Sequence, residues 1–444
     1  MYLLTAMNVL SAQSIAAGGS SSYAICDTGT IMKWGTTNGT GGSFVPMAFS
    51  SLSNIVKIEA NGNNFFAIKN DGTLWASGSN NSFGGLGIGT NSSAALPIQV
   101  NLTGVIAVAA GHLHSLFLKS DGTVWSSGWN VYGELGIGNN LDTNLPVQIP
   151  SLSGITAISA GKYHSVALKN DGTVWVWGSD AFSQLGNDSP FTASNIPIQV
   201  AGISNVIAID TGMYFTHALK SDGTLWGWGQ NYNGELGCGQ TANSFVPVQT
   251  AGLTDIVSFA DGYTHAFAIK SDGVVYGWGV ASSFQLGNGS TATNYTPVVI
   301  PGLNGSIKIV SGEFHGLAIK NDHTVRSWGY NTNGQLGSGS TAWNETPALV
   351  ASSLCSLLAI DKIPTAEISF SIFPNPANNE FQIKFKTFGS DSFFEVYNNI
   401  GALIQKNRIY SKNTTINISS YSKGLYFIKV SDDNKSTTQK LLVK

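Results

Sequence analysis

Short runs of alternating apolar and polar positions, separated by glycine-rich turns, cover most of the chain. In one stretch, residues 105–111 (VIAVAAG) form an apolar run that ends in glycine, and residues 114–119 (HSLFLK) alternate. The turn SDG follows, and residues 123–128 (TVWSSG) alternate again, which is the pattern of a β-hairpin. A fourth run, residues 145–149 (LPVQI), carries a proline that suits an edge strand. The unit therefore predicts four short strands and no helix.

This unit recurs along the chain with a period of about fifty residues. Six hairpin turns carry an aspartate at spacings of 50, 50, 51, 50 and 50 residues: Asp71, Asp121, Asp171, Asp222, Asp272 and Asp322. A seventh, more divergent copy comes first, in residues 23–35 (YAICDTGTIMKWG). A long, regular period with four strands per unit is typical of a β-propeller in which each unit is one blade. We therefore expect an all-β chain with a seven-bladed β-propeller over residues 14–360.

Tryptophans recur at fixed positions of the third run of each unit. Nine of the eleven tryptophans occupy the two slots of a WxWG pattern. Large rings at one strand position in every copy would fill the wedge between neighbouring blades. We interpret them as core residues.

Both ends of the predicted propeller carry distinctive segments. Residues 354–360 (LCSLLAI) align with the first strand of a further unit. We expect residues 355–360 to complete a blade with strands of the N-terminal copy and to close the ring, so that deleting them lowers the melting temperature. Residues 1–13 (MYLLTAMNVLSAQ) are interpreted as the remnant of a secretory signal peptide that is cleaved after Gln13.

The charge distribution predicts a second domain. Residues 1–365 hold 12 Lys and Arg against 19 Asp and Glu, whereas residues 366–444 hold 10 against 6. The change of sign indicates a boundary, which we place at a linker of residues 361–367 before a C-terminal domain of residues 368–444. The acidic propeller argues against nucleic acid as a partner.

Cysteines and hydropathy add two exclusions. The chain has three cysteines, Cys26, Cys238 and Cys355, in no shared motif. They predict neither a disulfide framework nor a zinc site, and we interpret them as small buried thiols. No run of eighteen or more apolar residues is present, so no membrane span is predicted.

Several motifs resemble the repeats of the regulator of chromosome condensation family. They are residues 108–118 (VAAGHLHSLFL), 158–168 (ISAGKYHSVAL), 171–178 (DGTVWVWG) and 233–239 (NGELGCG). The resemblance covers residues 14–356 and implies a seven-bladed propeller. The eukaryotic family member is a nucleotide exchange factor for a small GTPase and docks on nucleosomes. Neither role is expected of an acidic propeller outside a bacterial cell.

The C-terminal segment resembles a second family, the type A sorting domain of type IX secretion. The motifs are residues 370–385 (FSIFPNPANNEFQIKF), 395–404 (EVYNNIGALI) and 416–430 (INISSYSKGLYFIKV). The resemblance implies a small β-sandwich over residues 368–444 that engages the type IX secretion machinery. It also implies a chain that is secreted from a diderm bacterium or displayed on its outer-membrane surface.

One repeat slot holds a histidine in four copies: His114, His164, His265 and His315. Copies on different blades lie too far apart to share a metal ion, whose bonds to nitrogen are about 2 Å long. We expect structural hydrogen bonds to the backbone instead. The turn aspartates lack the spacing of a calcium loop and are interpreted as hairpin residues. No metal and no cofactor is predicted.

The turn before the histidine slot carries large aromatic residues, which a turn rarely needs for folding. Tyr163, Tyr214, Tyr263 and Phe314 are predicted to form an arc on one face of the propeller, and Trp129 adds an aromatic residue from a longer loop. Aromatic residues of this kind dominate protein–protein binding energies. The alternative is that they pack into the mouth of the ring and stabilise it. Burial of all four arc residues would exclude the binding arc.

These observations favour a secreted or surface-displayed binding module whose target is an extracellular protein or a glycan. A monomer is expected. The alternatives are a secreted enzyme with a face pocket, active on glycans or peptides, and a structural adhesin component. No catalytic residue is predicted: Glu134 and Glu235 occupy a GxLG slot in which other copies carry glutamine, so we interpret them as repeat variants.

Overall fold

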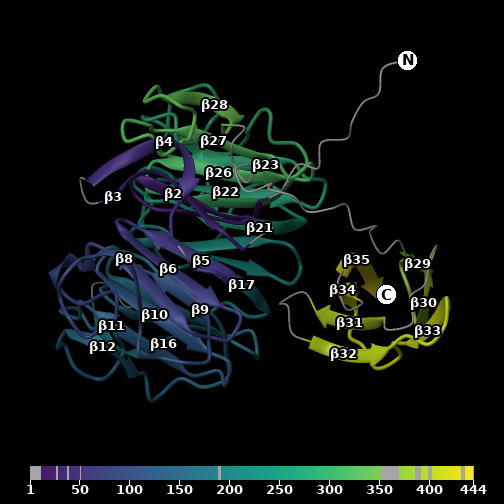
Figure 1. The fold of residues 1–444 in the computed structure, drawn as a ribbon. Coiled ribbons are helices and arrows are strands. Elements are labelled where there is room, and N and C mark those ends of the chain that lie inside the picture. The colour runs from purple at the N-terminus through teal and green to yellow at the C-terminus, as the bar shows by residue number, and fades with distance from the viewer. Residues whose placement is uncertain are drawn as a thin grey trace. The chain divides into compact units, whose positions relative to one another are not determined.

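The computed structural model describes residues 12–26, 29–37, 40–50, 52–188, 192–351, 370–385, 392–398, 403–431 and 436–443. The chain divides into two compact units, residues 1–358 and 359–444, and each is treated by itself (Figure 1). The predicted fold class is confirmed. Seven four-stranded sheets follow one another along the first unit, and two further sheets form the second.

Each of the seven sheets is one blade, an antiparallel meander whose spatial order follows the sequence. The first three blades are β1–β4 (Ala12–Ala17, Ser21–Cys26, Ile31–Thr37, Thr40–Ala48), β5–β8 (Ile55–Asn61, Asn64–Lys69, Leu74–Gly78, Ala94–Gln99) and β9–β12 (Val105–Ala110, His114–Lys119, Val124–Gly128, Thr143–Gln148). The last four are β13–β16 (Ile155–Ala160, His164–Lys169, Val174–Gly178, Ser194–Gln199), β17–β20 (Val206–Thr211, Phe215–Lys220, Leu225–Gly229, Ser244–Gln249), β21–β24 (Ile256–Asp261, His265–Lys270, Val275–Gly279, Asn294–Val299) and β25–β28 (Ser306–Ser311, His315–Lys320, Val325–Gly329, Asn344–Leu349). Among the described residues the sole helical element is the 3-10 turn η1 (Asn80–Ser82).

The hairpin between the second and third strands explains why the repeat keeps its aspartate. In the fourth blade, Asp171 Oδ1 accepts hydrogen bonds from the Thr173 backbone N–H at 3.0 Å and from its hydroxyl at 2.6 Å. Gly172 between them has a φ of +80°, a conformation that glycine adopts without steric cost. These aspartates are therefore occupied within their own turns.

The first strands of the blades line the middle of the ring. Each first strand contacts the first strand of the next blade, from β1 through β25, and β25 in turn contacts β1. The ring is therefore closed, and the residues at the ends of seven short strands converge on one axis. This convergence positions the site described below.

Tryptophans of the second WxWG slot fill five of the seven interfaces between blades, whereas Trp75, Trp125, Trp175 and Trp226 of the first slot, predicted as core residues, are only partly buried. Trp34, Trp177, Trp228, Trp278 and Trp328 are wholly buried. Each donates its indole N–H to a backbone carbonyl of the preceding blade, as Trp177 does to Glu134 at 2.7 Å and Trp228 does to Gln184 at 3.1 Å. An indole ring that packs within its own blade and donates a hydrogen bond to the preceding blade fixes the angle between the two blades.

The expected signal cleavage after Gln13 and the expected ring closure by residues 355–360 concern the two ends of the propeller. Strand β1 supplies the first strand of the first blade and begins at Ala12, so it includes Gln13, the expected cleavage point. Residues 355–360, which were expected to close the ring, lie outside the described residues, as do the expected linker and residues 1–11.

The interpretation of the cysteines as small buried thiols was wrong for Cys26, which is not a thiol, and for Cys238, which is only partly buried. Cys26 is buried in β2 and disulfide-bonded, whereas Cys238 is free. The third cysteine, Cys355, is outside the described residues. The odd count concealed a pair because the sequence has no spacing signal for it.

The second unit consists of two small sheets around one core. One sheet has the order β29-β30-β33 and the other the order β32-β31-β34-β35. Phe381, Ile383, Val396, Ile428 and Leu441 are buried in the shared core. The strands are β29 (Phe370–Phe373), β30 (Glu380–Phe385), β31 (Phe393–Asn398), β32 (Leu403–Arg408), β33 (Asn413–Asn417), β34 (Gly424–Ser431) and β35 (Ser436–Val443).

Candidate functional site

A cavity of about 270 Å³ lies on the axis of the ring, and we call it the axial cavity. All seven first strands contribute to its wall, together with the turns that follow them. Most wall positions are small or apolar, as the repeat dictates. The polar exceptions are Glu59, Asn61, His112, Ser159, Lys162, Asp210, Thr211, Asp261, Tyr263, Ser311 and Glu313.

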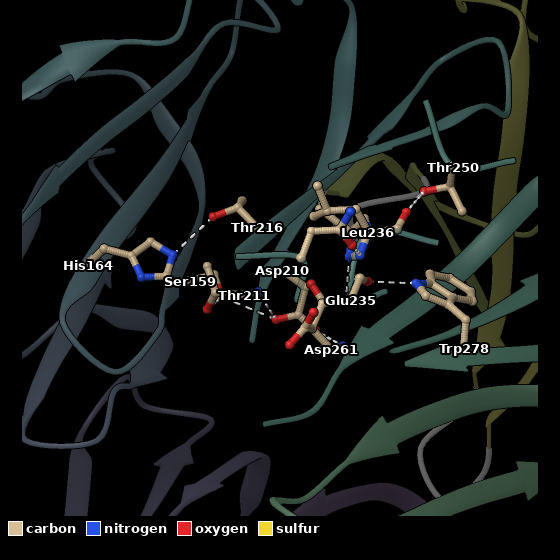
Figure 2. Close-up of polar contacts among 12 residues, drawn as sticks. Ser159, His164, Asp210, Thr211, Thr216, Glu235, Leu236, Thr250, Asp261 and Trp278 are labelled. Atoms are coloured by element: carbon tan, nitrogen blue, oxygen red, sulfur yellow. Dashed lines mark hydrogen bonds and ion pairs between the residues drawn. The ribbon is translucent and has the colours of Figure 1, made fainter. Parts of the chain in front are cut away.

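Two aspartates from neighbouring blades meet at the wall of the axial cavity. Asp210 lies near the end of β17 and Asp261 ends β21, and the Asp261 backbone N–H donates to Asp210 Oδ2 at 2.9 Å. Asp210 Oδ1 accepts from the Thr211 N–H at 2.9 Å and from the Ser159 hydroxyl at 3.2 Å. Figure 2 shows these four residues grouped together. Burial, and secondly the charge of Asp261, raises the pKa of Asp210 to about 7.

A buried histidine anchors the second aspartate. His217 Nδ1 lies 2.8 Å from Asp261 Oδ1, and neither side chain is exposed to solvent. The sequence makes room for the imidazole, because a Cβ at Gly227 would lie only 2.7 Å from the His217 ring. The Asp261 carboxyl group therefore bonds His217 through Oδ1, and its buried Oδ2 atom has no hydrogen-bond partner among the described residues.

Two more acids face lysines across the ring. Burial raises the pKa of Glu59 to about 8, the charge of Asp210 adds to that increase, and Lys308 opposes it. Burial also raises the pKa of Glu313, which Lys162 opposes. Lys308 donates to the Ser14 hydroxyl at 3.1 Å. Glu59 and Glu313 are thus opposed by lysines from other blades.

Aromatic residues of four blades directly follow or belong to the lining of the axial cavity. Tyr163, Tyr214, Tyr263 and Phe314 are all partly exposed, so the burial that would have excluded a binding arc is not found. Tyr163 and Tyr214 have ring centroids 6.0 Å apart, and those of Tyr263 and Phe314 are 5.8 Å apart. We call these four residues the aromatic arc. Tyr263 also lines the axial cavity.

Lys162 lies among the tyrosines of the aromatic arc. Its Nζ atom is 5.3 Å from the ring centroid of Tyr163, 5.6 Å from that of Tyr214 and 6.0 Å from that of Tyr263. Aromatic faces attract cations at these distances. Lys162 was not identified from the sequence as part of this site, because its position over three rings depends on the packing of three consecutive blades.

Trp129, the fifth predicted binding residue, contacts another loop residue. Its ring packs edge-on against Phe83 at 4.3 Å between centroids. Other loop rings extend the arc itself: Tyr132 lies 5.7 Å from Tyr163, and Phe182 lies 4.5 Å from Tyr214. Tyr132 and Phe182 therefore continue the aromatic surface, and Tyr330 continues it beside Phe314, with ring centroids 6.3 Å apart.

The four repeat histidines bridge neighbouring blades. His114, His164, His265 and His315 place Nε2 within 2.8–3.0 Å of the hydroxyls of Ser165, Thr216, Ser311 and Ser22, respectively. We expected backbone partners, and that expectation was wrong for Nε2. Ser165 and Ser22 donate their own protons to backbone carbonyls, so His114 and His315 are the donors. Burial lowers the pKa of His114, His164 and His265 to about 3 and that of His315 to about 4, which keeps all four neutral.

The GxLG acids serve the loops in which they lie. Glu134 Oε2 accepts from the Tyr132 N–H at 2.9 Å, and Glu235 Oε2 accepts from the Asn233 N–H at 2.8 Å. Gln184 makes the same contact with Phe182 at 2.7 Å. Within the described residues, no group of three or more His, Cys, Asp or Glu side chains is placed to hold a metal ion.

Sequence reasoning missed the polar residues of the axial cavity. Asp210 and Asp261 were not among the acids weighed, nor were Glu59 and Glu313. The available signal was a substitution within the repeat: other copies carry Ala109 or Ser159 at the slot of Asp210, and Ala110 or Ala160 at the slot of Asp261. A charged residue at a normally small, inward position indicates a local specialisation.

The two units match different family models. Residues 371–444 match the family described as "Secretion system C-terminal sorting domain". This domain directs export by type IX secretion in Bacteroidetes, so the chain is secreted or displayed at the cell surface. Within the described residues, no helix has the length and apolar character needed to span a bilayer.

Known propellers resemble the first unit. The ultraviolet-B receptor UVR8 of Arabidopsis thaliana is 28% identical over 255 residues, which cover 54% of this chain and 58% of that protein. The chain therefore matches less than two thirds of the length of this relative. Yeast RCC1 (Prp20), solved bound to Kap60, has a TM-score of 0.65 at 20% identity and covers 79% of this chain and 89% of its own. Human WBSCR16 has a TM-score of 0.62 at 21% identity, over 69% of this chain and 85% of its own.

Three family models describe the propeller itself. Residues 71–118 and 105–134 match models of the regulator of chromosome condensation (RCC1) repeat. Residues 143–364, half of the chain, match the model described as "RCC1-like domain". With seven closed blades of this repeat and a matching model over half of its length, the chain belongs to the RCC1-like domain family.

Proposed function

We propose that the protein is an exported binding module that holds an extracellular macromolecule on the face bearing the aromatic arc. The observation that carries this proposal is the partial exposure of Tyr163, Tyr214, Tyr263 and Phe314 at the lining of the axial cavity. Tyrosine and phenylalanine supply large contact area with little side-chain entropy to lose. A closed ring of seven blades holds these rings in a fixed arrangement, which lowers the entropic cost of binding.

An enzymatic function has weaker support from the residues of the axial cavity. Glycan-active enzymes use two carboxyl groups that both reach the substrate. Asp210 and Asp261 are adjacent, but the Asp261 side chain is wholly buried and bonded to His217. Asp261 therefore offers no second free carboxyl group beside Asp210, and the other acids of the wall, Glu59 and Glu313, are opposed by Lys308 and Lys162. We therefore favour binding over catalysis.

The experiment compares binding by the full chain and by arc variants. The full chain, immobilised by its C-terminal end, is screened against extracellular proteins and glycans of its own cell surface. Each ligand found is then titrated against Tyr214→Ala and Tyr163→Ala. We expect each substitution to weaken binding by about 2 kcal/mol, roughly thirtyfold in Kd.

The matched control is Tyr295→Ala, which removes an exposed tyrosine from β24, the fourth strand of its blade. This variant should bind as the unaltered protein does. Equal affinity of the Tyr214→Ala, Tyr163→Ala and Tyr295→Ala variants for every ligand would contradict the proposed face. A ligand that loses affinity only in the Tyr295 variant would place binding on the blade edges.

A further inference from the structure

The axial cavity contains one carboxyl group without a cationic partner. Asp261 has His217, Glu59 is opposed by Lys308, and Glu313 is opposed by Lys162. Asp210 accepts hydrogen bonds only from neutral donors, namely Ser159 and two backbone N–H groups. Among the described residues, Asp210, Glu59 and Glu313 all lack a Lys, Arg or His within ion-pair distance. The charges of Lys308 and Lys162 nevertheless lower the pKa of Glu59 and of Glu313, whereas no basic residue is among the influences on the pKa of Asp210. The wall therefore presents one uncompensated acid to the cavity.

The mouth above this acid already attracts a cation. The Lys162 ammonium lies within 6.0 Å of three tyrosine ring centroids, and Lys162 and Tyr263 both line the axial cavity. The three rings come from the turns of successive blades, the fourth, fifth and sixth. A positive group that approaches along the axis thus meets aromatic faces first and a carboxylate next. The aromatic faces and the carboxylate both favour a positive charge.

We propose that the axial cavity takes one positively charged group, an ammonium or guanidinium on a slender alkyl chain, which passes the tyrosine rings and places its charge beside Asp210. This inference rests on the proposed function, because the group is then a lysine or arginine side chain of the protein held on the aromatic arc. The cavity volume of about 270 Å³ agrees with a single side chain as the occupant. This volume lies just below the roughly 300 Å³ at which pockets for drug-sized ligands begin.

Protonation of Asp210 links this binding to pH. The pKa of Asp210 is raised to about 7 by burial and by Asp261, and Glu59 is the other acid coupled to it. A cationic ligand stabilises the ionised form of Asp210 and so lowers this pKa. Binding near neutral pH therefore releases a proton, and affinity increases as pH rises from about 6 to about 8.

The first experiment uses small probes on the full chain. n-Butylamine and n-butylguanidine are titrated by calorimetry, with n-butanol as the neutral probe of similar shape. We expect both cations to bind with a Kd on the order of 1 mM, and n-butanol to bind at least tenfold more weakly. Asp210→Asn should weaken cation binding at least tenfold and remove its pH dependence. Equal binding of n-butanol, or unchanged binding by Asp210→Asn, would overturn the proposal.

Two further variants separate this site from general charge effects. Glu345→Gln removes the same charge from an exposed position on β28 and should leave cation binding unchanged. Lys162→Met removes the chain's own ammonium from the tyrosines and should tighten probe binding. A loss of binding in Glu345→Gln equal to that in Asp210→Asn would reduce the effect to net charge and contradict the site.

A second arm distinguishes the source of the cation. A capped Gly-Gly-Lys-Gly-Gly peptide is compared with the same peptide carrying Nε-acetyl-lysine. If the lysine peptide binds and the acetyl-lysine peptide does not, the occupant is a lysine side chain of a partner protein. If n-butylamine binds and neither peptide does, the occupant of the same site is a small amine. If no cation binds while Tyr214→Ala still loses a macromolecular ligand, the cation site is wrong and the proposed binding face stands.

Discussion

The indole N–H of Trp34 donates a hydrogen bond to the backbone carbonyl of Gln335, 2.8 Å away, across 301 positions of sequence. Trp34 lies in β3 of the first blade, and Gln335 lies in the loop between β27 and β28 of the last. The same contact joins other neighbouring blades, as between Trp278 and Glu235 at 2.8 Å. The interface that closes the ring is therefore built like the four other interfaces that carry this tryptophan.

The first prediction follows from this equivalence. Trp34→Ala should lower the free energy of unfolding by about 3–5 kcal/mol, because it empties a fully buried site and removes an inter-blade hydrogen bond. Trp177→Ala, in the same slot within the ring, is the matched control and should cost a similar amount. Urea unfolding followed by tryptophan fluorescence measures both. A loss for Trp34→Ala much below that for Trp177→Ala would show that the closing interface contributes less.

The second prediction concerns the buried pair His217 and Asp261. His217→Leu and Asp261→Ala should each lower the free energy of unfolding by about 3–5 kcal/mol, because each leaves a buried polar partner unpaired. The double variant reproduces the residues that the third blade carries at these slots, Leu116 and Ala110. It should be more stable than either single variant. Additive losses in this double-mutant cycle would mean that the two side chains are not coupled.

The third prediction uses the raised pKa of Asp210. The ordinary aspartate value is 3.8 and the folded value is about 7, so the folded protein holds the proton more tightly than the unfolded chain does. Asp210 therefore contributes stability below about pH 4 that is lost as pH rises through about 7. Asp210→Asn should gain stability relative to the unaltered protein over this range. Parallel pH profiles of the two melting temperatures would refute the assignment.

The fourth prediction separates binding from packing in the aromatic arc. Tyr214 is partly exposed and contacts Phe182 with ring centroids 4.5 Å apart, whereas Trp228 is fully buried. Tyr214→Ala should lower the free energy of unfolding by about 1 kcal/mol, and Trp228→Ala by about 3–5 kcal/mol. Guanidinium unfolding provides the measurement. If Tyr214→Ala costs as much as Trp228→Ala, the arc serves mainly to stabilise the mouth of the ring.

The blades could be predicted closely because their signals are local. The strands expected at 105–111, 114–119, 123–128 and 145–149 are observed at Val105–Ala110, His114–Lys119, Val124–Gly128 and Thr143–Gln148. Alternation, a turn aspartate and a glycine with positive φ all act within a few residues. Seven copies of such a unit also predict the number of blades.

The cavity was harder to predict because its contacts join distant residues. Ser159, Asp210 and Asp261 come from three consecutive blades and meet only because the first strands of neighbouring blades pack side by side. The aromatic arc was identified from residue type and turn position, yet Lys162 among its tyrosines was not. The hydroxyl partners of the histidines were missed for the same reason: Ser165 is 51 positions away from His114.

Blade five departs from its sister copies at several inward slots, where it carries Asp210, Thr211, Phe215 and His217. Blades two, six and seven also place charged residues on the cavity wall, at Glu59, Asp261 and Glu313, and the ring still closes around them. Because the ring is built from similar blades, it tolerates a blade that carries unusual polar residues. In a propeller assembled from near-copies, the least typical copy is the first place to look for chemistry.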